Sequence, residues 1–166
     1  MICPSCGFEN LQGSDECENC GADLRTSDLP APSTEFEAEL VNVALAAVRH
    51  HSPLTIEPSA TAADAVRQMQ EAGAGCLIVE EDGQLRGILS ERDLVLKLDL
   101  ARLDATTVAD LMTRDPVVLR PDDSIAVAIN KMAVGGFRHI PLVENGRATG
   151  IVSARDVFRH ILSAQS

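Results

Sequence analysis

The sequence is poor in aromatic side chains and in positive charge. Its 166 residues include four Phe and neither Trp nor Tyr, so a stacking platform for single-stranded nucleic acid is not expected. Lys and Arg total 14, Asp and Glu total 25, and the formal net charge is −11. Because a chain this acidic repels phosphate backbones and anionic lipid headgroups, we expect neither a nucleic-acid partner nor a membrane partner.

The chain also lacks a long apolar run, a secretory leader and a catalytic constellation. A helix that spans a bilayer needs about 20 apolar residues, and no run in the sequence comes near that length. Met1 leads directly into Cys3 and Cys6, without the basic and apolar regions of a signal peptide. No nucleophile stands beside an evident base. We therefore expect a cytoplasmic protein without enzymatic activity.

Four of the five cysteines form two Cys-x-x-Cys pairs, which are Cys3 with Cys6 and Cys17 with Cys20. In a reducing compartment this spacing is typical of a metal site rather than of disulfides. Four thiolates around a tetrahedral ion favour zinc, and a fully coordinated zinc is structural. A segment with so little core needs such an ion to fold. Residues 1–24 are therefore predicted to be a zinc ribbon, and an iron site for electron transfer is the alternative.

The charge of the ribbon favours a protein partner over nucleic acid. Up to Arg25 it carries five acidic residues and one basic residue, and a zinc ion with four thiolates adds negative charge. Such a surface repels a phosphate backbone. The identity of the protein partner is unknown from the sequence.

Composition divides the remainder of the chain into a linker and two halves. Residues 25–35 contain Pro30 and Pro32 and few apolar side chains, so they are predicted to be a semi-extended linker. Residues 36–100 are assigned to an N-terminal helix and a first repeat, and residues 101–166 to a second repeat. The Ala-rich stretch 36–48 is predicted to be a packing helix that docks on the repeats or on a second subunit.

An internal repeat organises these two halves. Residues 53–93 lie over residues 116–156 at a constant offset of 63 residues without a gap. Identical pairs include Pro58/Pro121, Met69/Met132, Gly87/Gly150, Ser90/Ser153 and Asp93/Asp156. A unit has therefore been duplicated.

Each unit is predicted to fold in the order β-α-β-β-α. The first strands are placed at 54–56 and 117–119, and helices follow the N-cap candidates Thr61 and Ser124. Asp82-Gly83 and Asn145-Gly146 separate apolar runs and predict hairpins of strands 76–80 with 85–89 and 139–143 with 148–152. Final helices begin after Ser90 and Ser153. Because one unit of this size buries too little surface alone, we expect an α/β (α+β) domain in which the two units pack with pseudo-twofold symmetry.

Three segments of this repeat resemble a tandem pair of CBS domains, the Bateman module. They are 111–117 (LMTRDPV), 138–143 (RHIPLV) and 150–156 (GIVSARD), the last echoed by 87–93 (GILSERD). The resemblance covers about residues 43–163. It implies a regulatory module that binds AMP, ADP, ATP or S-adenosylmethionine between the repeats, and a homodimer. The N-terminal segment resembles the short zinc ribbons of many bacterial and archaeal proteins, while its CPSCG sequence also resembles rubredoxin.

The same resemblance implies roles for individual residues. Asp93 and Asp156 would bind ribose hydroxyls, and Ser90 and Ser153 would meet phosphate. The backbone near Thr55 and Val118 would face the adenine, and Arg138 and His139 would reach phosphate. Arg92 and Arg155 add positive charge next to the two motifs.

A structural interpretation of the two motifs stays open. Ser-x-x-Asp at a helix start is also a capping box, and Thr61 with Asp64 and Thr107 with Asp110 have the same spacing without any assigned ligand.

The two repeats also differ in sequence. Gly75-Cys76 stands where the second repeat has Arg138-His139, so we expect one site to bind better than the other, or only one to bind. Cys76 is predicted to be a buried apolar residue, and His50-His51 are predicted to lie at a solvated helix end.

Three functions remain open at this level. The first is a non-enzymatic sensor that binds an adenosine-containing ligand in the CBS pair and signals to a protein partner, possibly through the zinc ribbon. The second is a ligand-free CBS dimer that serves as a scaffold for the ribbon. The third is an iron-binding redox protein that resembles rubredoxin.

Overall fold

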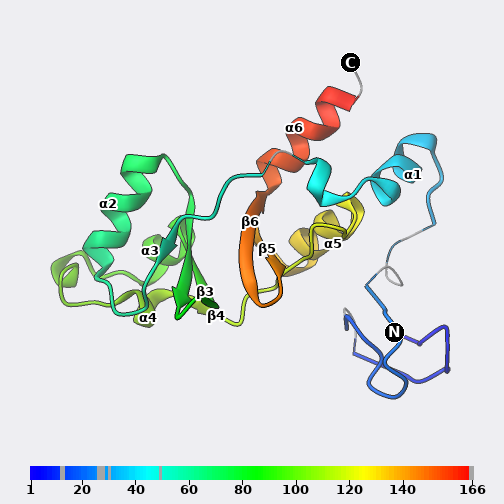
Figure 1. Ribbon diagram of the computed structural model, residues 1–166, viewed down its shortest axis with the longest axis horizontal. Helices are drawn as coiled ribbons and strands as arrows, with labels where there is room; N and C mark the ends of the chain where they lie inside the picture. Colours follow the sequence, from blue (N-terminus) through cyan, green and yellow to red (C-terminus); the bar gives the residue numbers. More distant parts are fainter. Residues whose placement is uncertain (12–13, 26–28, 30, 49, 165–166) are drawn as a thin grey trace.

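The computed structural model describes residues 1–11, 14–25, 29, 31–48 and 50–164. Two hairpins face each other at the centre of the repeat region, and helices cover their outer sides (Figure 1). The mixed α/β architecture expected from the sequence is confirmed. Within the described residues, no helix is long and apolar enough to cross a membrane.

The first repeat follows the predicted order. Its elements are β1 (Thr55–Ile56), α2 (Ala62–Ala72), β2 (Cys76–Glu81), β3 (Gln84–Ser90) and α3 (Glu91–Lys97). β1 is parallel to β2, and β2 is antiparallel to β3. Asp82 and Gly83 have φ angles of 52° and 72°, which the tight turn of a hairpin requires.

The second repeat contains the same hairpin and helices. Its elements are α5 (Ile125–Gly135), β5 (His139–Glu144), β6 (Arg147–Ser153) and α6 (Ala154–Ala164). The strand predicted at 117–119 is wrong, because only Leu119 pairs there, through an isolated bridge to Leu142. The cause is Pro141: at the equivalent position the Ile78 amide donates to the Leu54 carbonyl at 2.8 Å, and proline has no amide hydrogen to donate.

The N-terminal helix is shorter than predicted. α1 spans Glu35–Asn42 rather than 36–48 and begins at a capping box of Thr34 and Glu37. The chain then leaves the helix because it bonds to the second repeat. The Ile125 amide donates to the Val43 carbonyl at 3.0 Å, and the Leu45 amide donates to the Asp123 carbonyl at 2.8 Å.

A 3-10 turn, η1 (Leu45–Ala47), follows α1. Leu45 and Val48 are buried in the core of the second repeat, where they lie with Ile125, Ile140 and Leu142. The segment that precedes the first repeat therefore packs on the second repeat.

Each sheet is also extended by the segment that precedes the other repeat. A short 3-10 turn η2 (Leu100–Arg102) and α4 (Val108–Leu111) connect the repeats and lead to β4 (Thr113–Arg114). β4 pairs with β3 of the first repeat, and His51 pairs with Ile151 of the second. This exchange gives the repeats their pseudo-twofold relation.

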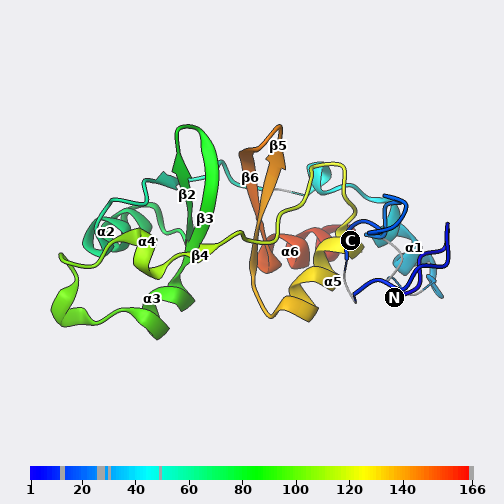
Figure 2. The same cartoon turned by 90° about the horizontal axis from the view of Figure 1, so that it is seen from below.

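A small apolar cluster joins the two sheets, whose hairpins lie side by side in Figure 2. It contains Cys76, Ile78, Ile88 and Ile151. Cys76 is 4% exposed, so the prediction of a buried apolar residue is confirmed. Burial and the nearby Glu91 charge raise the pKa of its thiol to about 12.

Candidate functional site

Two equivalent backbone turns position the N-terminal cysteines. In the first, the Gly7 amide donates to the Cys3 carbonyl at 2.9 Å, and in the second the Gly21 amide donates to the Cys17 carbonyl at 2.8 Å. Gly7 and Gly21 have φ angles of 73° and 69°. A side chain is strained in this left-handed region, which explains a glycine directly after each Cys-x-x-Cys pair.

The four cysteine sulfurs fit a tetrahedral metal ion. The Sγ atoms of Cys3, Cys6, Cys17 and Cys20 all lie within 4.8 Å of one another. Cys3 Sγ is 3.7 Å from Cys20 Sγ, and Cys6 Sγ is 3.6 Å from Cys17 Sγ. An ion with bonds of about 2.3 Å to each sulfur holds its ligands roughly 3.8 Å apart. The predicted residues therefore converge as one cluster that could hold a metal ion.

Local hydrogen bonds favour the thiolate form of Cys17. Burial raises the pKa of this thiol, but hydrogen bonds from the backbone amides of Cys20 and Asn19 and from the Asn10 side chain outweigh burial and lower it to about 6. Thiolates, rather than thiols, bind metal ions.

Two ion pairs attach the ribbon to the second repeat. Lys131 Nζ on α5 lies 2.6 Å from Asp15 Oδ1. Arg25 lies 2.6 Å from Asp123 Oδ1 and also pairs with Asp23. Asp123 is only 8% exposed and also accepts a hydrogen bond from the Arg120 amide at 2.7 Å. The Arg25–Asp123 pair is therefore partly desolvated, which reduces screening by solvent and salt.

In the first repeat, Ser90 and Asp93 form a capping box at the start of α3. Asp93 Oδ2 accepts hydrogen bonds from the Ser90 amide at 3.0 Å and from the Ser90 hydroxyl. Asp93 Oδ1 accepts from Lys97 Nζ at 2.7 Å and from Thr113 Oγ1 at 3.1 Å. Burial raises the pKa of Asp93, but the hydrogen bonds from Lys97 and Ser90 outweigh burial and keep it below the usual value.

The second repeat contains the same capping box with different neighbours. Asp156 Oδ2 accepts from the Ser153 amide at 3.0 Å and from the Ser153 hydroxyl. The Asp156 side chain is 4% exposed, and His51 Nε2 lies 3.6 Å from its Oδ1. His51 therefore lies in a bridging segment beside the motif, and the prediction of a helix end for His50-His51 is wrong.

The capping interpretation holds for every Ser/Thr-x-x-Asp motif that the sequence singled out. Thr61 with Asp64 and Thr107 with Asp110 form the same boxes. Capping alone therefore does not distinguish Asp93 and Asp156. Their distinguishing feature is the contact each makes with the segment that precedes the other repeat.

His139 lies between the repeats. A Cβ atom on Gly75 would come within 3.2 Å of its imidazole ring, so a larger residue at this position would require the ring to shift. Burial lowers the pKa of His139, the charges of Glu91 and Asp156 oppose this shift, and the net effect is a lowered pKa. Arg138 is exposed at the start of β5.

The two motif arginines differ in their contacts. Arg92 donates to the carbonyl of Gly136 in the other repeat at 2.9 Å. Arg155 is exposed and has no hydrogen bond or ion pair to any described residue.

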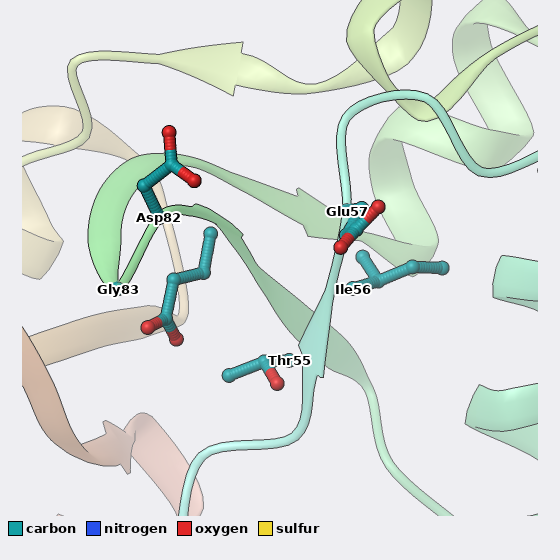
Figure 3. Close-up of a pocket in the computed structure, with 6 residues that line it drawn as sticks. Thr55, Ile56, Glu57, Asp82 and Gly83 are labelled. Atoms are coloured by element: carbon teal, nitrogen blue, oxygen red, sulfur yellow. The ribbon is translucent and has the colours of Figure 1, made fainter.

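The two predicted adenine contacts also differ. Thr55 lies in β1 and its carbonyl accepts from the Gln68 side chain at 3.0 Å. Val118 is 39% exposed and lies outside any strand. Thr55 also lines a cavity of about 250 Å³ (Figure 3). The carboxylates of Glu57, Glu80 and Asp82 line the same cavity, so its charge disfavours a phosphate.

Lys97 and Thr113 were not identified from the sequence, and His51 was predicted to lie at a solvated helix end. Lys97 lies four residues after Asp93 on one helix, a spacing at which opposite charges meet. This contact could therefore have been predicted from the sequence. Thr113 and His51 reach the aspartates from the opposite half of the chain, and only the exchange of segments between repeats brings them there.

Comparisons with known proteins agree with this architecture. The CBS domain family model matches residues 45–99 and 108–163. The uncharacterized 17.7 kDa protein in bps2 3′region of Acidianus ambivalens is 34% identical over 113 residues, which are 67% of this chain and 68% of that protein. The chain spans only 21% of the CBS domain-containing protein CBSCBSPB3 of Arabidopsis thaliana, to which it is 33% identical over 122 residues, 72% of this chain.

Two solved structures extend the comparison. CBSX2, solved in complex with AMP, is 25% identical with a TM-score of 0.64, over 74% of this chain and 98% of that chain. The CBS domain pair of MJ0100, solved with 5′-methylthioadenosine and S-adenosyl-L-methionine, has a TM-score of 0.67 over 75% of this chain and 98% of that chain. Its identity is 20%, so that likeness concerns the fold alone. With two matched repeats, a shared fold and a four-cysteine cluster in front of them, the chain belongs to the CBS domain family as a tandem CBS-pair regulatory protein.

Proposed function

We propose that this protein is a non-enzymatic sensor that binds AMP or another adenosine-containing ligand in its CBS pair and signals to a protein partner. The observation that carries the proposal is the buried Asp156 carboxylate. It stands at the meeting point of the repeats, in a chain that is 25% identical to a CBS protein solved with AMP. A carboxylate oxygen with unused acceptor capacity suits the two hydroxyls of a ribose. For regulation, the ligand must bind two arrangements of the repeats with different affinity.

The cations around Asp156 support a phosphorylated ligand. Arg155 is the next residue in the chain and is exposed, and Arg138 is exposed at the start of β5. In a chain with a net charge of −11, exposed arginines beside a carboxylate that can hold a diol favour an anionic nucleoside over a neutral one.

The proposal includes structural zinc at Cys3, Cys6, Cys17 and Cys20. A bound zinc ion supplies the folding free energy that the small ribbon core lacks. Because all four ligands are cysteines, no open coordination position remains for a catalytic water.

The proposal also includes a homodimer. Val95 on α3 and Phe158 on α6 stand 63 residues apart at equivalent positions and are 82% and 59% exposed. Figure 2 shows α3 and α6 on the side of the sheets away from the hairpin turns. Apolar side chains at matching places in both repeats favour a second copy as their cover. Light scattering should give twice the chain mass, and V95E with F158E should halve it; a wild-type monomer would contradict the dimer.

The ribbon is the proposed docking site for the protein partner. Ile2 and Leu11 are 71% and 77% exposed, and the segment up to Arg25 carries five acidic residues and one basic residue. Exposed apolar side chains in an acidic segment favour a partner with an apolar patch and basic neighbours.

Thermal unfolding with AMP, ATP and S-adenosylmethionine tests the ligand proposal. A ligand at 100 times its Kd adds about 2.7 kcal/mol, which for a chain of this size corresponds to roughly 5–10 °C in Tm. The shift should vanish in D156A. D64A is the matched control, because Asp64 occupies the same kind of capping box without a ligand role.

The outcomes separate the competing functions. A shift with any of the three ligands that D156A removes supports the sensor. The absence of a shift with all three would favour a ligand-free scaffold. A coloured, iron-containing preparation would contradict zinc and favour a redox protein.

A further inference from the structure

The two motif aspartates differ in how many hydrogen-bond donors already hold them. An ionised carboxylate offers about four acceptor positions. At Asp93 four donors fill them: the Ser90 amide, the Ser90 hydroxyl, the Lys97 ammonium and the Thr113 hydroxyl. A ribose that approached Asp93 would have to displace a donor from each of the positions it used.

Asp156 keeps half of this capacity unused. Both donors at its Oδ2 come from Ser153. Among the residues that the structure describes, none donates a hydrogen bond to Oδ1, and the contact with His51 Nε2, at 3.6 Å, is longer than a hydrogen bond. The Asp156 side chain is only 4% exposed, and its Oδ1 retains acceptor capacity, so this site favours a ligand that donates.

Lys97 is the main source of the difference. The residue 63 positions later is His160, and in the described part of the chain it makes no hydrogen bond or ion pair with Asp156. Lys97 Nζ also donates to the Leu111 carbonyl at 2.8 Å. The carbonyl at the equivalent position, 63 residues earlier, belongs to Val48. It lies 3.0 Å from His50 Nδ1 rather than from a lysine. The first repeat therefore contains a cation bonded to its motif carboxylate that the second repeat lacks.

The arginines follow the same asymmetry. Arg92 is held by the Gly136 carbonyl at 2.9 Å, whereas Arg155 is exposed and bonds to no described residue. At the first motif both nearby cations are engaged within the protein. At the second, an arginine is available for a phosphate.

We propose that Lys97 blocks the first motif by occupying the position of a ligand at Asp93, so that each chain binds one nucleotide, at Asp156. This inference rests on the proposed function and adds which of the two motifs binds. Lys97 is a specificity-determining residue in this account, because it sets the number of sites rather than contacting the bound nucleotide.

Calorimetric titration of the metal-loaded full chain with AMP tests the role of Lys97. The wild type should bind one AMP per chain, and K97M should bind two. H160M is the matched control, since it places the same substitution at the equivalent position of the second repeat, and it should still bind one. The double variant K97M/D93A should again bind one AMP per chain.

A second pair of variants tests the assignment without relying on K97M. D93N should leave the affinity for AMP within about twofold, whereas D156N should weaken it at least about tenfold, the size expected for a lost charged hydrogen bond. The inference would be overturned, with the proposed function intact, if the wild type bound two AMP molecules per chain or if K97M bound only one. It would also be overturned if D93N weakened AMP binding more than D156N. If neither the wild type nor K97M binds AMP, the proposed function falls with it.

Discussion

The two repeats share a backbone fold, but their Ser-x-x-Asp motifs differ in how many hydrogen-bond donors contact the aspartate. Both place a serine and an aspartate in a capping box after the second strand of a hairpin. In the first repeat a lysine and a threonine also donate to the carboxylate. In the second, no described residue other than Ser153 donates a hydrogen bond to it, and an imidazole lies 3.6 Å away. A duplicated motif therefore indicates a duplicated fold, whereas the donors around the motif decide whether a ligand can be accepted.

The ribbon adds a second difference between the repeats, because its two ion pairs both reach the second repeat. Removing the metal with a chelator should have the largest effect of any change here. The ribbon should unfold, since structural zinc contributes roughly 10–16 kcal/mol in small domains. Hydrogen exchange should then accelerate in the ribbon and in α5, which holds Lys131, but not in β2. Equal acceleration in both repeats would contradict the one-sided attachment.

Core truncations test whether the repeats fold as one unit. Leu77 and Ile140 occupy equivalent positions and are both fully buried. L77A and I140A should each lower the free energy of unfolding by about 2–5 kcal/mol. Urea denaturation of either variant should show a single transition. Two transitions would mean that the repeats unfold independently and that the apolar cluster between their sheets is weak.

The capping serines should reveal the different support of the two aspartates. S90A should lower the free energy of unfolding by about 1 kcal/mol, as for a typical N-cap. S153A should cost about 2 kcal/mol, because it leaves the more buried carboxylate with fewer donors. Denaturation with urea measures both values. A larger effect at Ser90 would contradict the unequal donor count.

Acid titration gives the smallest expected effect. Because the pKa of Asp93 is lowered from 3.8 in the folded protein, its ionisation stabilises the fold above that value, and the stabilisation is lost as the pH falls below it. K97M removes one of the hydrogen bonds that lower the pKa, so its Tm should fall less steeply than that of the wild type below pH 4. An unchanged slope would mean that Lys97 does not support the Asp93 charge.

Local sequence signals predicted the hairpins and the helix starts well. Asp82-Gly83 and Asn145-Gly146 specify tight turns by backbone chemistry alone, and Thr61 and Ser124 act as the expected N-caps. The cysteine cluster could also be predicted from the sequence, since spacing and residue type define such a cluster. These features depend on contacts between residues close in the chain.

Features that depend on contacts with the other repeat could not be predicted from the sequence. The strand predicted at 117–119 fails because Pro141, on a neighbouring strand, cannot donate a hydrogen bond. α1 ends early because Val43 and Leu45 bond to the loop before α5. The sequence predicted unequal ligand sites but not the unequal donors at the two aspartates, because the approach of Thr113 to one aspartate and of His51 to the other follows from the exchange of segments between repeats.

A crystal structure of the protein with AMP would test the central claim most directly. We expect one nucleotide per chain, with its ribose hydroxyls on Asp156 Oδ1 and with Lys97 still bonded to Asp93. A nucleotide whose ribose lies on Asp93, with Lys97 displaced, would contradict the account.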